Sequence, residues 1–226
     1  MQVLPLTTVL CMSGLAAEAR IARAAGLPVV IGAGDRERKA AVIESAARDA
    51  NCLMSFGIAG ALGPHLRPGD VVISTEVVSA DHRWAAAEPF RSRVADLARQ
   101  IGAFEGAVFG ASAILATAEE KRRAWRETGA LAVDLESDIV ARIASRAGIP
   151  FVVARTIADN ASRELPPAAL IPLSEAGTPK LARVLASVLR RPRQIMTLFA
   201  LARETRMALA ALAGPAHVLR GLAASP

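Results

Sequence analysis

Acidic side chains stand at unusual junctions in the stretch VDLESDIVARIASRAGIPFVVARTIADNAS, residues 133–162. Asp134, Glu136 and Asp138 crowd the start of a predicted helix, and Asp159 ends an apolar strand. Glu18 occupies a similar place, in the first turns of the helix that follows the first strand. Taken singly, each acid fits a helix cap or a first-turn charge that complements the helix dipole. Together, Glu18, Glu136 and Asp159 put three carboxylates beyond the ends of separate strands, where α/β proteins bind ligands.

The elements that must position these acids follow from the hydrophobic pattern. Short runs rich in Val and Ile alternate with longer amphipathic segments, which indicates an α/β domain with helices covering a largely parallel sheet. The predicted strands are 8–12, 29–31, 53–58, 70–78, 107–110, 132–134 and 151–157, and the predicted helices are 16–25, 36–50, 91–101, 119–127, 136–147, 175–189 and 195–213. The texture changes at LRRPRQ, residues 189–194, so we expect one domain over 1–190 and an appended, basic, amphipathic helical tail over 191–226.

Composition narrows the class of protein. The chain has 226 residues and a formal charge of +6, which favours an anionic partner. Nucleic acid is not expected, because Tyr is absent, aromatics are 4% and no basic run is interleaved with stacking side chains. Cys11 and Cys52 lie in apolar runs, as reduced, buried thiols of a cytosolic protein do. The N-terminus lacks a basic region before its apolar run, so no secretory signal is expected, and no run is long enough for a membrane span.

The glycine-rich segment GIAGALGPHLRPGDVVIS, residues 57–74, matches neither a dinucleotide fingerprint nor a P-loop. Its glycines could serve only to turn the chain after a strand. Alternatively, small residues there leave room for a flat ligand or a sugar, and Ala59 and Gly60 are then the expected contacts. The three histidines have no metal-ligand spacing, so no metal site is expected.

Three motifs carry a resemblance to a known family. MSGLAAEA after the first strand, the glycine-rich segment, and VDLES followed by PFVVARTIADNA resemble the nucleoside phosphorylase and nucleosidase family, which includes methylthioadenosine/S-adenosylhomocysteine nucleosidase. The similarity covers about residues 8–190 and is strongest to the hopanoid-biosynthesis-associated branch. It implies a three-layer α/β/α domain around a twisted, mostly parallel mixed sheet, a homodimer or larger assembly, and no metal or redox cofactor.

The resemblance also implies roles for individual residues. Asp159 matches the aspartate that protonates purine N7, and Glu136 matches the glutamate that binds the ribose hydroxyls. Leu135 stands where many relatives have Met, and Ser74 falls where relatives place a small polar residue lining the site. A protonated Asp159 suits this chemistry, because adenine leaves poorly unless its ring gains a proton, and burial would raise the pKa of the carboxyl group.

Departures from the family leave two points open. LATAEEKR, residues 115–122, lacks the Phe that commonly stacks near the base, so Phe151 or Trp84 is a candidate stacking partner. Glu18 aligns where hydrolytic relatives carry a water-activating glutamate, which favours water over phosphate as the nucleophile. Arg20 nevertheless leaves phosphate open, because it could form an anion pocket with Ser13 and Gly14.

The leading hypothesis is therefore cleavage of the N-glycosidic bond of a 5′-substituted adenosine, adenosylhopane, with release of adenine. The alternatives are a soluble methylthioadenosine/S-adenosylhomocysteine-type nucleosidase or purine nucleoside phosphorylase, and a membrane-associated module that binds adenine without cleaving it. Ile195, Leu198, Phe199 and Ala202 share one stripe of the tail, beside Arg203 and Arg206. Such a helix can lie on a membrane or pack on a protein core. A lipid-linked substrate favours a cytoplasmic protein with peripheral contact at the inner membrane surface.

Overall fold

The computed structural model describes residues 9–224, so Thr8 of the first predicted strand and the last two residues lie outside the described part. The strands are β1 (Val9–Ser13), β2 (Val29–Ile31), β3 (Cys52–Ala61), β4 (Val71–Ser74), β5 (Glu76–Val78), β6 (Arg83–Ala85), β7 (Phe104–Glu105), β8 (Val108–Gly110), β9 (Ala132–Asp134) and β10 (Phe151–Asp159). The helices are α1 (Ala16–Ala24), α2 (Arg36–Ala46), α3 (Phe90–Gln100), α4 (Ala118–Thr128), α5 (Ser137–Ala147), α6 (Leu181–Arg190), α7 (Ile195–Ala211), α8 (Ala213–Leu219) and α9 (Gly221–Ala224). Three short 3-10 turns are η1 (Ala47–Asp49), η2 (Pro167–Leu170) and η3 (Pro192–Gln194).

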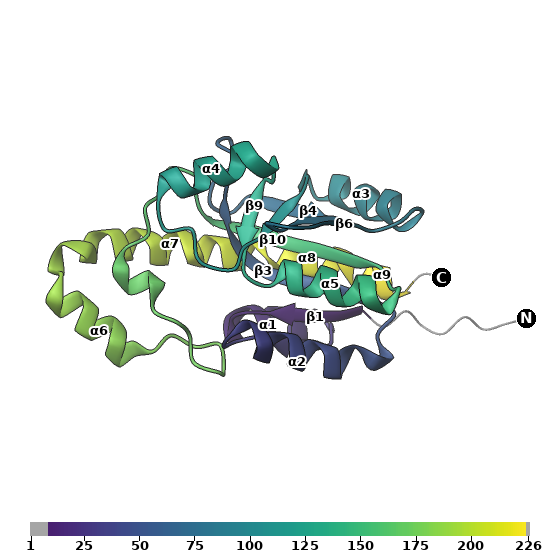
Figure 1. The fold of residues 1–226 in the computed structure, drawn as a ribbon, viewed down its shortest axis with the longest axis horizontal. Helices are drawn as coiled ribbons and strands as arrows, with labels where there is room; N and C mark the ends of the chain where they lie inside the picture. The colour runs from purple at the N-terminus through teal and green to yellow at the C-terminus, as the bar shows by residue number, and fades with distance from the viewer. Residues whose placement is uncertain (1–8, 225–226) are drawn as a thin grey trace, which may run out of the picture.

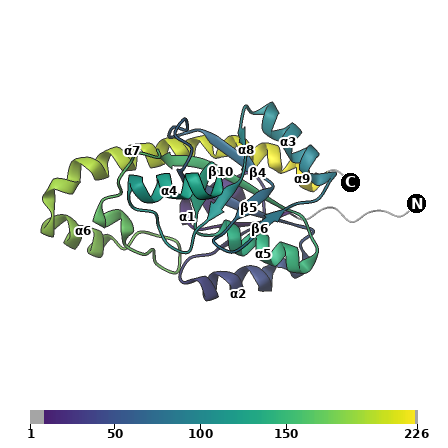
Figure 2. The same ribbon diagram turned by 45° about the horizontal axis from the view of Figure 1, so that its top comes forward.

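Helices cover both faces of one curled, mixed sheet, which confirms the predicted three-layer α/β/α architecture (Figures 1 and 2). The period of two along the strands divides the side chains between the faces. On β1, Leu10 and Met12 join the core under α2 and α5, while Val9 and Cys11 join the core under α1, α3 and α8. Cys11 and Cys52 are buried free thiols, as expected.

The sheet forks at β3, its longest strand. The parallel pairing of β1 with β3 ends at Met12 and Ser55, whereas the antiparallel pairing of β9 with β3 begins at Gly60 and Val133. One side of β3 therefore has no strand partner around Ile58 among the described residues. Backbone groups left in this way need other hydrogen-bond partners. Side chains supply them, and they are the side chains of the candidate site.

Several predicted elements differ from the observed ones. The strand predicted at 53–58 extends to Ala61, so Gly57 and Gly60 lie inside a strand and do not form the expected turn. The strand predicted at 70–78 is two strands, because the Ser74 hydroxyl donates to the Glu76 carbonyl at 2.7 Å and accepts the Glu76 N–H at 2.9 Å. The short, partly exposed strands β6 and β7 were not predicted. The helix predicted from 175 begins only at Leu181, and the one predicted to run to 213 ends at Ala211.

The C-terminal segment is built into the domain rather than appended to it. The Thr156 hydroxyl of β10 donates to the Ala208 carbonyl of α7 at 2.8 Å, and Leu212, Ala216 and Leu219 belong to the core under α1 and α3. The predicted boundary at residue 190 is therefore not the edge of the core, because the small Ala and Leu side chains of this segment pack closely on the sheet. No helix within residues 9–224 is both long and apolar enough to cross a bilayer.

Candidate active site

A cavity of about 790 Å³ lies beside the fork, at the carboxyl ends of β1, β3 and β10 and the start of α5. Glu18, Glu136 and Asp159 all line it, so the three acids singled out from the sequence meet in one cavity. Ala59 and Gly60 of β3 line it as well, and so does Leu135, which precedes Glu136. Six of the eight residues predicted for the site are thus brought together.

Glu18 replaces the missing strand neighbour of β3. One carboxylate oxygen accepts the N–H of Ile58 at 2.8 Å, and the other accepts the N–H of Leu15 at 2.8 Å. Burial raises the pKa of Glu18 to about 7, against the lowering effects of Arg155 and of the two backbone N–H groups. Glu18 is therefore poised to exchange a proton near neutral pH.

Gly57 is needed where Glu18 and Arg155 meet. A Cβ on Gly57 would lie 2.5 Å from the Arg155 Nη1 and 2.5 Å from the Glu18 Cδ. Both side chains are almost fully buried, so neither has room to withdraw. The glycine of the GIAG motif thus allows a close approach of side chains to the strand, and it does not serve a turn.

Arg155 contacts two of the acidic side chains, Asp134 and Glu136. Its Nε lies 2.6 Å from Asp134 Oδ2 and its Nη2 lies 3.6 Å from Glu136 Oε2, while Nη2 also donates to the Ser55 hydroxyl at 2.5 Å. Burial lowers the pKa of Arg155, but Asp134, Glu136 and Glu18 raise it and the net direction is upward. Asp134 also accepts the N–H groups of residues 136 and 137, so it fixes the first turn of α5.

Glu136 faces the loop after β1. Its Oε1 lies 2.6 Å from the Lys39 Nζ of α2, and a Cβ on Gly14 would lie 3.1 Å from the same oxygen. Lys39 is also 3.4 Å from the Leu135 carbonyl, which holds its ammonium group over the start of α5. Glu136 is thus a fixed acceptor at the cavity wall, suited to sugar hydroxyls.

Asp159 ends β10 on the opposite wall and is paired with the ammonium group of Lys121 on α4. Lys121 is 1% exposed and also donates to the carbonyls of Asn160 at 3.2 Å and Arg163 at 3.0 Å. Burial raises the pKa of Asp159, and Lys121 opposes that rise without cancelling it. The expected direction is therefore found, although the surroundings of Asp159 include a cation and not only apolar strand residues.

Two predicted site residues lie elsewhere. Ser74 lines a separate, smaller cavity, and its hydroxyl is engaged with the Glu76 backbone. Phe151 is the first residue of β10, whereas Asp159 is the last. Because the cavity lies at the carboxyl end of this strand, Phe151 is remote from it and is buried in the core under α2 and α5. Trp84 packs against the same core and stacks on His82, so neither aromatic residue reaches the cavity. Arg20 is exposed and does not line the cavity either.

The lysines that line the cavity were not predicted from the sequence. The chain contains three, Lys39, Lys121 and Lys180, and all three line this cavity. The sequence held a signal, because every other basic residue is Arg, and lysine offers a compact ammonium where a bidentate group would not fit. No group of three or more His, Cys, Asp and Glu within the described residues could hold a metal ion.

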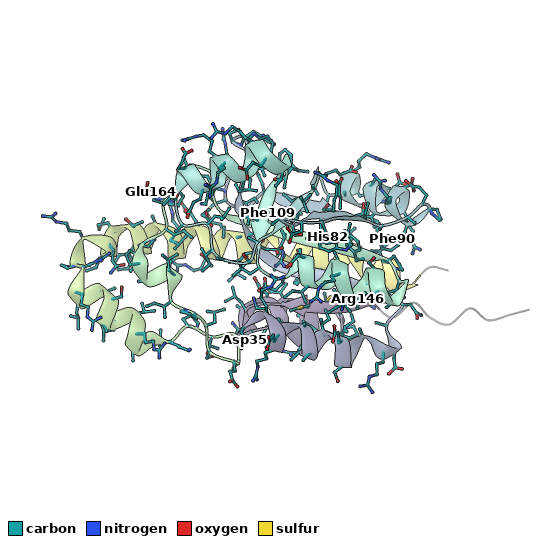
Figure 3. The ribbon with its side chains drawn as sticks, in the orientation of Figure 1. Asp35, His82, Phe90, Phe109, Arg146 and Glu164 are labelled. Atoms are coloured by element: carbon teal, nitrogen blue, oxygen red, sulfur yellow. The ribbon has the colours of Figure 1, made fainter. Side chains whose placement is uncertain are left out.

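Much of the remaining lining of the cavity is apolar. It includes Ala113, Ile114, Leu115, Leu165, Leu170 and Leu173, from the segment before α4 and the segment before α6. The latter segment returns to the N-terminal loops, where Glu175 pairs with Arg38 at 3.0 Å, next to the α2 cap Asp35 labelled in Figure 3. The cavity thus combines charged side chains with many apolar ones, and Glu175 and Lys180 line it too.

Comparison with known proteins agrees with this geometry. The family model of the phosphorylase superfamily matches residues 32–190. The structure resembles 5′-methylthioadenosine/S-adenosylhomocysteine nucleosidase from Neisseria meningitidis in complex with methylthio-immucillin-A, with 18% identity, a TM-score of 0.68 and coverage of 96% of this chain and 100% of that one. It also resembles futalosine hydrolase of Helicobacter pylori, with 17% identity, a TM-score of 0.63 and coverage of 82% and 98%.

The nucleosidase of Helicobacter pylori with butyl-thio-DADMe-Immucillin-A is a further neighbour, at 14% identity and a TM-score of 0.63, with 92% and 97% of the two chains covered. A comparison with curated protein sequences gave no match. The solved structures establish the fold, and the family model covers more than half of the chain. The chain therefore belongs to the phosphorylase superfamily, as an enzyme of the nucleoside phosphorylase and nucleosidase type.

Proposed function

We propose that the protein cleaves the N-glycosidic bond of a 5′-substituted adenosine and releases adenine. The observation that carries this proposal is the meeting of Asp159, Glu136 and Glu18 in one cavity whose remaining lining is largely apolar. The reaction needs three groups. These are a general acid that protonates the purine, a hydrogen-bond acceptor for the ribose hydroxyls, and a general base that activates the nucleophile.

Asp159 acts as the general acid in this mechanism. Its buried carboxyl group donates a proton to purine N7, so that adenine departs as a neutral molecule and takes the bonding electrons with it. The raised pKa of Asp159 favours the protonated form that this step requires. Lys121 holds the carboxyl in place and stabilises the carboxylate that remains after transfer.

Glu136 supports the sugar while the bond breaks. The ribose becomes electron-poor at its anomeric carbon, and a fixed carboxylate next to it both orients the hydroxyls and stabilises the positive charge. Lys39 and Arg155 prevent Glu136 from turning away, because they contact different oxygens of its carboxylate.

Water is the nucleophile that the site favours. Glu18 can accept the proton of a water molecule because its pKa of about 7 leaves much of it ionised at neutral pH. The arginine considered for phosphate, Arg20, lies outside the cavity, which removes one support for phosphorolysis. Of the three lysines that line the cavity, Lys180 is the one that forms no ion pair within residues 9–224. A phosphate-dependent reaction would therefore have to rely on Lys180 to bind the phosphate.

The many apolar side chains that line the cavity suggest a large, water-insoluble 5′ substituent. At about 790 Å³ the cavity is near the upper end of the ~300–1,000 Å³ range of small-molecule sites. We infer a lipid-linked nucleoside, adenosylhopane, as the substrate. A cytoplasmic protein in peripheral contact with the inner membrane would meet such a substrate where it resides. Assembly as a homodimer or larger stays a prediction.

The decisive assay measures adenine release from adenosylhopane and from methylthioadenosine, each with and without phosphate. We expect adenosylhopane to turn over faster, without need of phosphate. Asp159→Asn should lower the rate by about 10²–10⁴-fold at unchanged circular dichroism, the loss typical of a removed general acid. Wild-type turnover by Asp159→Asn would refute the mechanism. Faster turnover of methylthioadenosine would assign a soluble nucleosidase instead, and a phosphate requirement a phosphorylase.

A further inference from the structure

Residues 181–199 form an arm, made of α6, η3 and the first turn of α7, at the end of the molecule opposite both termini (Figures 1 and 2). The arm carries every large apolar side chain in residues 9–224 that is at least 60% exposed: Leu181 74%, Leu185 60%, Leu189 74%, Met196 78% and Phe199 69%. An exposed apolar patch of this kind marks a surface that binds a partner.

The leucines of α6 form one stripe. Leu181, Leu185 and Leu189 recur every four residues, so they lie on the same face of the helix. α6 contains no buried residue at all, although most of its side chains are apolar. A ten-residue helix gains most of its stability from packing an apolar face, and this face has no cover within the described chain.

The charge of the same region is of one sign. Residues 176–203 contain Lys180, Arg183, Arg190, Arg191, Arg193 and Arg203 and no Asp or Glu. Arg183, Arg190 and Arg191 line a cavity of about 500 Å³ between α6 and η2, whose other walls include Pro167 and Ile171. None of these three arginines has an ion-pair partner among residues 9–224. Their guanidinium groups are available to anions.

We propose that the arm docks on the surface of a bilayer containing anionic phospholipid. The leucine stripe, Met196 and Phe199 enter the acyl boundary, and the arginines bind lipid phosphate groups. A bilayer supplies the two things that the arm lacks, apolar cover and negative charge. A second copy of the chain fits less well, because a two-fold interface would set this patch against itself and oppose arginines to arginines without an acid between them.

The arm also lies next to the active-site cavity. Ile171 lines both the arginine-rich cavity and the cavity that holds Asp159, and Leu170, Pro172 and Lys180 continue the wall of the latter up to the first residue of α6. Docking of the arm thus brings this wall of the active-site cavity close to the lipid surface. That link to a lipid-borne substrate rests on the proposed function, whereas the docking itself does not.

Flotation of the full chain with vesicles tests the docking. The probes are vesicles of phosphatidylcholine alone and of phosphatidylcholine with phosphatidylglycerol in equal parts. We expect binding to the mixed vesicles that weakens with salt, and at least ~10-fold weaker partitioning for Leu185→Glu, because burying one leucine contributes on the order of a decade in an equilibrium constant. Arg190→Glu should weaken binding to the mixed vesicles specifically.

Matched controls separate the arm from general surface effects. Phe104→Glu introduces the same acid at an exposed apolar side chain on β7, and Arg123→Glu reverses a charge on α4; both should bind vesicles like the wild type. Absence of wild-type binding, equal losses in the controls, or a wild-type dimer that Leu185→Glu dissociates would each overturn the proposal. Methylthioadenosine turnover by the same variants reports the proposed function separately, because this soluble substrate does not require a bilayer.

Discussion

Replacing Lys121 by Met probes the most consequential contact in the site. The ammonium of Lys121 is 1% exposed and pairs with Asp159, whose pKa is raised by burial and held down in part by this lysine. Methionine keeps the length of the stem and removes the charge. We expect the pKa of Asp159 to rise further in Lys121→Met, because burial then raises it without the lowering effect of the lysine.

The magnitude follows from the buried pair. Removing one partner of a buried ion pair costs about 3–5 kcal/mol when the other stays charged. Asp159 can escape by protonation, and an acid whose folded pKa lies above its unfolded value of about 3.9 loses stability as the pH rises toward the folded pKa. The penalty of Lys121→Met should therefore be smaller at about pH 5 than at about pH 8, and should reach at most ~3 kcal/mol once Asp159 is ionised. In a chain of this size, ~3 kcal/mol lowers the Tm by roughly 6–12 °C.

Two measurements check this reasoning. Thermal unfolding at the two pH values should show the larger loss on the alkaline side, and the alkaline limb of kcat/KM for adenine release should move to higher pH, since the acid keeps its proton longer. Arg122→Met is the matched control, because it removes an exposed cation from the same helix. An equal loss of Tm at both pH values together with an unmoved alkaline limb would refute the role assigned to Lys121.

Two further predictions concern Glu18 and its neighbour Gly57. With a pKa of about 7, Glu18 should make kcat/KM rise as the pH passes through about 7, and Glu18→Gln should abolish that limb and lower the rate by about 10²–10⁴-fold in a pH-rate profile. Gly57→Ala should cost ~1–3 kcal/mol in urea unfolding, since its Cβ would press on Arg155 and Glu18, whereas Gly214→Ala in α8, with open space around it, should cost nothing. Equal midpoints for the two alanine variants would argue against the packing at Gly57.

Much of the fold was predictable because hydrophobic periodicity reports burial directly. The strands β2 and β9 and the start of α1 were predicted at their observed residues, and for β2 the run VVI followed by Gly32 sets clear limits. The fork at β3 was not predictable, because it depends on which strands meet along one long strand, and the pattern of one strand does not record its neighbours. The role of Gly57 was hidden for the same reason.

The site was predicted as acids without their counter-charges. Glu18, Glu136 and Asp159 could be found because acids at strand ends stand out against apolar runs. Arg155 lies in the middle of β10, where the neighbouring sequence offers no partner for its charge. Its partners are Asp134 of β9 and Glu136, the residue before α5. Phe151 was proposed only because residues 115–122 lack the usual aromatic residue, and it lies at the opposite end of β10 from Asp159.

The three acids of the cavity have different partners, and for Glu18 and Asp159 burial raises the pKa. Glu136 is fixed between Lys39 and Arg155, which pair with different oxygens of its carboxylate. Asp159 forms one ion pair within residues 9–224, with Lys121, and burial still raises its pKa against the lowering effects of Lys121 and Arg163. Glu18 forms no ion pair within residues 9–224 and relies on two backbone N–H groups, which leaves its pKa at about 7. These separate surroundings are what the proposed mechanism requires, in which Asp159 donates a proton to the purine while Glu18 accepts one from water.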